Sequence, residues 1–154
     1  MPWNLVKPVV NMKMQDLCLT PYPNHSKGCP NWGKKPGCPP HCKPIGQLID
    51  LEKDVWAVWT RFDLGTHVEK LRGKYPDWTD RQLKCCLYWQ PKARVALRQE
   101  IALFQKEHPG FEVVTTPEAS GVCLTPTMKQ VGIELEWPPE HWTYQIILAG
   151  CSVS

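Results

Sequence analysis

The chain has 154 residues, of which 42% are hydrophobic and 21% are charged, and its formal net charge is +3. This balance excludes a disordered polar chain and a strongly basic nucleic-acid binder, although it permits contact with an anion. The length suits one domain. We therefore expect residues 1–154 to form a single domain, with a metal-binding loop at residues 18–43 and an α+β body at residues 44–154.

The N-terminal residues contain prolines and lack the apolar core of a signal peptide. No apolar run approaches the roughly 18 residues that a membrane-spanning helix needs. We therefore expect a cytoplasmic protein without a membrane partner. In that reducing compartment the eight cysteines indicate metal binding or redox chemistry before disulfides. A secreted disulfide framework is the alternative, and the adjacent pair Cys85 and Cys86 suits it poorly.

The first half of the chain predicts an extended segment, a strand and two helices. Prolines favour an extended conformation for residues 1–17, and Pro44 suits the first turn of a short helix over residues 45–53. Residues 54–62 are rich in tryptophan and valine on both faces, which predicts a strand at the centre of a sheet. Residues 65–74 predict a helix that ends before a proline.

Two further helices and a strand are expected next. Thr79 resembles an N-cap for a helix over residues 80–89. The longest helix is expected over residues 92–108, where apolar residues recur at helical spacing and the sequence His-Pro-Gly gives a stop. Residues 111–115 then predict a strand.

The C-terminal part predicts a loop, a short helix and two strands. We expect the loop to run to about Thr125 and the helix to cover residues 126–131, with Gly132 as its C-cap. Residues 133–137 and 141–150 are strand candidates because apolar residues alternate along them. Together these elements predict an α+β fold: a small, mainly antiparallel sheet with helices packed on one face and a Cys/Pro-rich metal-binding loop near the N-terminus.

Residues 18–43 have no amphipathic period, but they contain four cysteines among prolines and glycines. These cysteines are Cys18, Cys29, Cys38 and Cys42. Only the last two have the close spacing of a metal-chelating knuckle, so the pattern fits neither a regular zinc ribbon nor a low-potential ferredoxin. The clustering still indicates a metal, because glycine turns and prolines can direct distant cysteines to one site.

Two ligand sets fit these cysteines. All four can close a zinc site or a [4Fe–4S] cluster, or three can hold a cluster and leave one iron open to a substrate. His25 and His41 are backup ligands or plain loop residues. Lys34, Lys35 and Trp32 are candidates for contact with a substrate, an anion or RNA, or else are solvated surface residues.

The remaining cysteines are weaker candidates. They are Cys85, Cys86, Cys123 and Cys151. Each is either a small core residue or a further ligand. Cys123 is the best candidate ligand of these four because we expect it in an irregular loop.

Two carboxylates form the main candidate for acid/base chemistry. On a strand over residues 133–137, Glu134 and Glu136 share one face, and together with His25 they are the candidate catalytic residues. The plain alternative is an edge strand with a solvent-facing side. No phosphate-binding glycine loop, serine nucleophile elbow or zinc-protease motif is present, which disfavours nucleotide hydrolysis and proteolysis.

Two blocks resemble a poorly characterised family of prokaryotic predicted metal-binding proteins. The run CLTPYPNHSKGCPNWGKKPGCPP at residues 18–40 resembles the opening block of that family, and EASGVCLTPTMKQVGIELEWPP at residues 118–139 is similar to its second block. The resemblance implies a cysteine-bound metal, in particular an iron–sulfur cluster, on Cys18, Cys29 and Cys38. Cys42 is outside the family pattern, which favours the open cluster. The resemblance implies no reaction.

The sequence therefore favours a metal-binding protein with a cysteine-ligated [4Fe–4S] cluster, in which an open iron would serve catalysis or redox chemistry. A zinc-stabilised nucleic-acid-binding module is the alternative, and a metal carrier or assembly protein is a second one. The sequence does not identify the partner, for which a small molecule and a nucleic acid are the two options, and it leaves open whether the protein is an enzyme.

Overall fold

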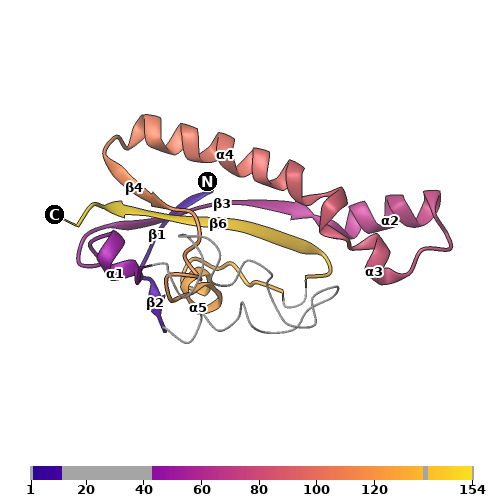
Figure 1. The fold of residues 1–154 in the computed structure, drawn as a ribbon, viewed down its shortest axis with the longest axis horizontal. Coiled ribbons are helices and arrows are strands. Elements are labelled where there is room, and N and C mark those ends of the chain that lie inside the picture. The colour runs from indigo at the N-terminus through magenta and orange to yellow at the C-terminus, as the bar shows by residue number, and fades with distance from the viewer. Residues whose placement is uncertain (1, 12–42, 137–138, 154) are drawn as a thin grey trace.

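The computed structural model describes residues 2–11, 43–136 and 139–153. Their centre is a four-stranded antiparallel sheet with the order β1-β3-β6-β4 (Figure 1). The strands are β1 (Trp3–Val6), β3 (Val55–Asp63), β4 (Phe111–Val114) and β6 (Trp142–Cys151). β3 pairs with β6 along its whole length and with β1 on its other edge. The predicted central strand over residues 54–62 is therefore confirmed, and so are the strands predicted at residues 111–115 and 141–150.

One face of the sheet is covered by the longest helix, α4 (Gln90–Glu107). The helix contributes Phe104, which is fully buried against Val58 of β3 and Ile147 of β6. The prediction of a long helix over residues 92–108 is confirmed, although the helix begins two residues earlier. Pro91 lies inside its first turn, where a missing N–H costs no helical hydrogen bond.

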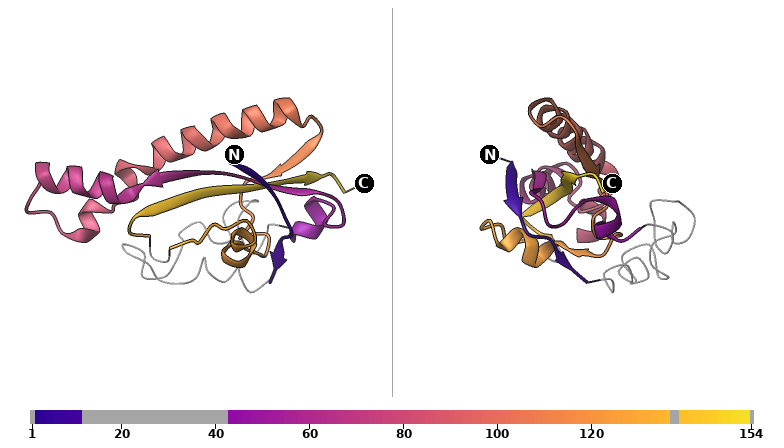
Figure 2. Two further views of the ribbon diagram at one scale, coloured as in Figure 1. Left: turned by 180° about the vertical axis from the view of Figure 1, so that it is seen from behind. Right: turned by 90° about the vertical axis from the view of Figure 1, so that its left-hand side faces the viewer.

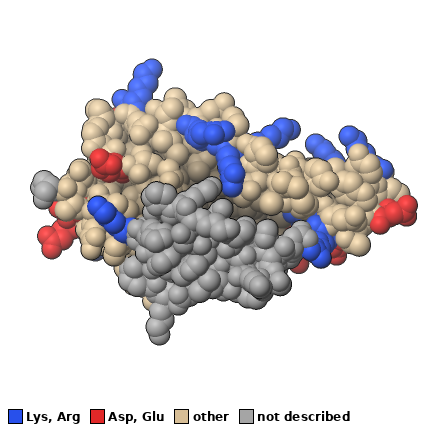
Figure 3. Space-filling model, viewed as in Figure 1, with Lys and Arg blue, Asp and Glu red and all other residues tan. Residues whose placement is uncertain are grey.

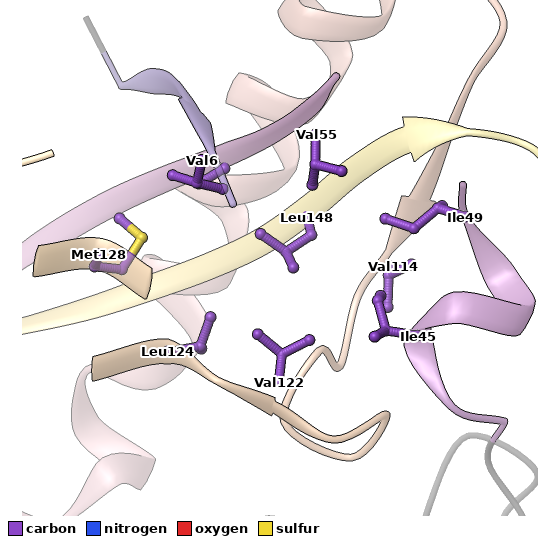
Figure 4. Close-up of a cluster of buried hydrophobic side chains, with 10 residues drawn as sticks. Val6, Ile45, Ile49, Val55, Val114, Val122, Leu124, Met128 and Leu148 are labelled. Atoms are coloured by element: carbon purple, nitrogen blue, oxygen red, sulfur yellow. The ribbon is translucent and has the colours of Figure 1, made fainter. Parts of the chain in front are cut away.

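The opposite face of the sheet is covered as well (Figures 1 and 2). Its cover consists of α1 (Ile45–Leu48), α5 (Leu124–Lys129) and a second sheet in which β2 (Val9–Val10) pairs with β5 (Val122–Cys123). In Figure 4, Ile45, Leu124 and Met128 point toward sheet residues such as Val55 and Leu148. The prediction that helices pack on one face only is wrong, because the central strands are apolar on both faces and each face needs cover.

Two short helices extend the molecule beyond one end of β3. In α2 (Leu64–Lys74), the carboxylate of Asp63 accepts hydrogen bonds from the N–H and the hydroxyl of Thr66. In α3 (Asp80–Leu83), Thr79 forms a capping box with Gln82. The predictions of a helix over residues 65–74 and of an N-cap at Thr79 are confirmed.

The helix predicted over residues 80–89 is broken after its first turn. A 3₁₀ turn, η2 (Cys86–Tyr88), replaces its second half. The indole N–H of Trp89, which is buried, donates to the carbonyl oxygen of Lys84 at 3.2 Å. That side-chain bond occupies a carbonyl that a continuing helix would have used for its own ladder.

Other differences occur where tertiary contacts decide the local structure. α1 is one turn long because Ile49 joins an isolated bridge to Ser152. α5 begins at Leu124 rather than at residue 126, and Gly132 follows it with a φ of 80°, as a helix end favours. Residues 133–136 are irregular rather than a strand. Within the described ranges, none of the helices has the length and hydrophobicity that crossing a bilayer demands.

Candidate functional site

A single turn at residues 117–122 binds one residue before and one residue after the cysteine-rich segment. The N–H of Asn11 donates to the carbonyl oxygen of Gly121 at 2.6 Å, and the N–H of Ile45 donates to the carbonyl oxygen of Ser120 at 2.9 Å. Adjacent Cα atoms are about 3.8 Å apart, so the two anchor points are neighbours. Gly121 has a φ of 92°, a conformation that favours glycine. Asn11 and Ile45 are therefore bound at neighbouring points of the described body.

The strand that precedes the cysteine-rich segment pairs with the second block of the family resemblance beside this turn. β2, which leads toward the cysteines, pairs with β5 of the second block through Val9 opposite Cys123 and Val10 opposite Val122. The fully buried Thr127 strengthens the junction: its Oγ1 accepts from the N–H of Val9 at 3.0 Å and donates to the carbonyl oxygen of Cys123 at 2.7 Å. The second block therefore binds the strand that precedes the cysteine-rich segment.

The same turn contributes a carboxyl group that the sequence interpretation did not single out. Burial raises the pKa of Glu118 above its ordinary value. A buried carboxyl with a raised pKa is a candidate for acid/base chemistry. Its place in the second block, between Pro117 and the small residues Ala119 and Ser120, was the available signal.

Most of the predicted ligands and contact residues lie outside the described residues. These are Cys18, Cys29, Cys38, Cys42, His25, His41, Lys34, Lys35 and Trp32. In the part of the chain that the structure describes, no three His, Cys, Asp or Glu side chains come together as a metal site would require. The metal site on these cysteines thus stays a prediction.

The four other cysteines are free thiols that lie on different elements. Cys86 is exposed on η2, whereas Cys85, Cys123 and Cys151 are half-buried. Cys123 lies on β5 rather than in the irregular loop that we expected. It is the one of these four that belongs to the junction with β2, because it pairs with Val9.

Glu136 organises the turn that precedes β6. Its Oε1 accepts from the backbone N–H groups of Glu140, His141 and Trp142, and its Oε2 lies 2.8 Å from Nδ1 of His141. The hydrogen bond from His141, with the backbone donors, lowers the pKa of Glu136 to about 2, and the same carboxylate raises the pKa of His141. Glu134 is exposed in the irregular stretch, so the two carboxylates do not share the face of a strand.

No protein-family model, curated protein or solved structure matches the chain. The function is therefore inferred from the chain's own residues, and the family resemblance remains a prediction.

Proposed function

We propose that the chain is a metal-binding protein whose cysteine-rich segment holds a [4Fe–4S] cluster through Cys18, Cys29 and Cys38. The donor set fits such a group, since thiolates are the ligands that iron–sulfur clusters take. In this arrangement one iron would lack a cysteine and would supply an open position for redox chemistry or substrate binding. Cys42 is the fourth ligand of the closed alternative.

The observation that carries this proposal is the common anchoring of the segment at one turn. Joining the ends of a flexible loop costs conformational entropy that grows with loop length. The body offsets this cost, because Asn11 and Ile45 are bound by the adjacent carbonyl groups of Gly121 and Ser120. A metal then has to close only the gaps inside the segment, which are ten, eight and three residues long.

Glu118 is the candidate acid/base residue that the body offers to the proposed site. Its carboxyl belongs to the anchoring turn, and burial raises its pKa above the ordinary value. This role concerns the residue's own ionisation and requires no particular substrate.

The experiment is metal analysis of the full chain purified without oxygen. We expect iron and acid-labile sulfide in equal amounts, about four of each per chain, together with the brown absorption of an iron–sulfur protein. Colourless protein with one zinc per chain would instead support the zinc-stabilised nucleic-acid-binding module. Iron that passes readily to an acceptor apoprotein would support the metal carrier.

Serine variants test the ligand set. Cys18→Ser, Cys29→Ser and Cys38→Ser should each lose iron, whereas Cys86→Ser is the matched control because that thiol is exposed on η2. Cys42→Ser separates the two ligand sets: intact iron supports three-cysteine ligation, and loss of iron supports the closed site. Iron that survives all of the first three substitutions would overturn the proposal.

A further inference from the structure

Positive charge is concentrated in residues 61–98. This stretch has nine lysines and arginines against four aspartates and glutamates, a net charge of +5, although the whole chain carries only +3. The rest of the chain is therefore net acidic. In Figure 3, lysine and arginine side chains lie along the edge of the molecule formed by α4 and α2. A local excess of this kind attracts anions despite the modest overall charge.

A hollow of about 750 Å³ lies where the end of β3, α2, η2 and the start of α4 meet β6. We call it the basic hollow, and its lining includes Arg61, Phe62, His67, Lys70, Tyr88 and Lys92. Among the described residues, no carboxylate lies within 4.0 Å of the ammonium groups of Lys70 and Lys92.

Asp63, the acidic residue of the lining, already accepts hydrogen bonds from Thr66. Asp63 accepts from the N–H of Thr66 at 3.0 Å with one oxygen and from its hydroxyl at 2.8 Å with the other. The guanidinium of Arg61 lies 4.3 Å from the ring centroid of Trp142, which fixes a cation over an aromatic face at the rim. Cations thus dominate the hollow.

His67 lines the basic hollow, and the lysines of the hollow affect its pKa. Burial first, and then the charges of Lys92 and Lys70, lower the pKa of its imidazole. Its buried Nε2 has no hydrogen-bond partner among the described residues. An imidazole nitrogen without a partner can donate to or accept from a polar ligand group, according to its tautomer.

Aromatic rings continue from the basic hollow into a neighbouring one. Tyr88 is 54% exposed, and it lines both the basic hollow and a second hollow of about 510 Å³ that Trp78 also lines. Trp78 lies 5.4 Å from Tyr88 and stacks on Tyr75 at 4.2 Å, measured between ring centroids. The three rings make a row beside the cations, which we call the aromatic row.

We propose that the basic hollow and the aromatic row bind single-stranded nucleic acid, with phosphates at Arg61, Lys70 and Lys92 and bases on Tyr88 and Trp78. Proteins that bind single strands combine a cationic groove with aromatic side chains on which bases stack. Two adjoining hollows that share Tyr88 suit a strand longer than one nucleotide. The exposed ring of Tyr88 suits unpaired bases, which a duplex does not present.

The test is fluorescence anisotropy of a labelled oligouridine of about 12 nucleotides with the full chain at several salt concentrations. Lys70→Ala combined with Lys92→Ala should weaken binding at least about 10-fold at low salt and reduce the slope of log K against log salt by about 1.4. Tyr88→Ala should weaken binding about 5-fold or more, while Tyr88→Phe, which keeps the ring, should bind like the parent chain.

The matched control is Lys7→Ala combined with Lys53→Ala, which removes the same charge from two exposed residues that line a hollow elsewhere. Equal weakening by both pairs, or binding that does not change with salt, would overturn the proposal. So would preference for anionic phospholipid vesicles, or full competition by AMP at the same nucleotide concentration.

A third pair separates this site from the cysteine-rich segment. If Lys34→Ala with Lys35→Ala abolishes binding while Lys70→Ala with Lys92→Ala leaves it intact, the strand binds the segment and the basic hollow is excluded. Iron is measured on every variant. Binding by a chain that never contains iron would contradict the proposed function and leave the nucleic-acid site standing.

Discussion

The N–H of Val9 donates a 3.0 Å hydrogen bond to the hydroxyl oxygen of Thr127, which is fully buried. The hydroxyl in turn donates to the carbonyl oxygen of Cys123, so one side chain joins β2, β5 and α5. Two residues further along the chain, the N–H of Asn11 donates to the carbonyl oxygen of Gly121, so both contacts bind the strand that precedes the cysteine-rich segment.

Thr127→Val should therefore destabilise the protein by about 1–3 kcal/mol, because the shape is kept while the part-buried N–H of Val9 and carbonyl oxygen of Cys123 both lose their partner. The fall in Tm, measured by circular dichroism, checks this. The same change at the exposed Thr115 is the control and should stay within about 0.5 kcal/mol of the parent chain. Equal shifts for the two variants would contradict the role given to the Thr127 hydroxyl.

Gly150 and Gly73 should respond to alanine with opposite signs. A Cβ at Gly150 would lie 2.9 Å from Cδ1 and 3.0 Å from Cβ of Ile49, so Gly150→Ala should cost about 1–3 kcal/mol through overpacking. A Cβ at Gly73 in α2 meets nothing within 4 Å, so Gly73→Ala should stabilise by about 0.5–1 kcal/mol. Urea unfolding measures the change in the free energy of unfolding for both variants. A stabilised Gly150→Ala chain would contradict the prediction, because it would show that the Ile49 side chain moves aside without cost.

The pair formed by Glu136 and His141 should stabilise its turn within a pH window. The raised pKa of His141 makes its contribution present below the ordinary value of 6.5 and lost as the pH rises through the folded-state pKa. The lowered pKa of Glu136 makes its contribution present above the ordinary 4.5 and lost as the pH falls toward about 2. The full contribution thus lies between those two ordinary values.

An NMR titration of the His141 ring tests this pair. Glu136→Gln should lower the pKa of His141, because the hydrogen bond and the charge of the carboxylate are the two largest causes of its elevation. Glu134→Gln is the control, since that exposed carboxylate is not among the causes. A pKa that ignores the Glu136 substitution would refute the assignment.

Glu118→Gln should raise stability at pH 8 but not at pH 4. Because burial raises the pKa of this carboxyl in the folded chain, its ionisation above the ordinary 4.5 favours the unfolded state. Glutamine keeps the shape without the charge. Glu107→Gln, at an exposed position at the end of α4, should show no such difference between the two pH values, as measured by thermal unfolding.

The parts of the fold that the sequence predicts are those set by local composition. β3, β6 and α4 carry long patterns of their own, and Thr79 and Asp63 cap helices through neighbours a few residues away. Residues 54–62 are apolar on both faces, which also indicates that both faces of the sheet are covered by other elements. The prediction of helices on one face alone did not use this pattern.

The parts that the sequence did not predict depend on distant partners. β2 and β5 are two residues long each and exist because they pair with each other across the chain. Glu136 bonds to three backbone N–H groups that only a turn can gather, which is why an alternating pattern gave no strand there. For the candidate site, the cysteines are visible in the sequence, whereas the turn that anchors them and Glu118 required the fold.

Because its two anchors are adjacent, the cysteine-rich segment can be replaced while the rest of the fold is kept. Since Asn11 and Ile45 bind neighbouring carbonyl groups, a linker of a few glycine and serine residues can span the two points while both backbone hydrogen bonds remain. Insertions, deletions and new ligand spacings can therefore accumulate in the cysteine-rich segment under selection for its chemistry, while the body evolves under selection for packing.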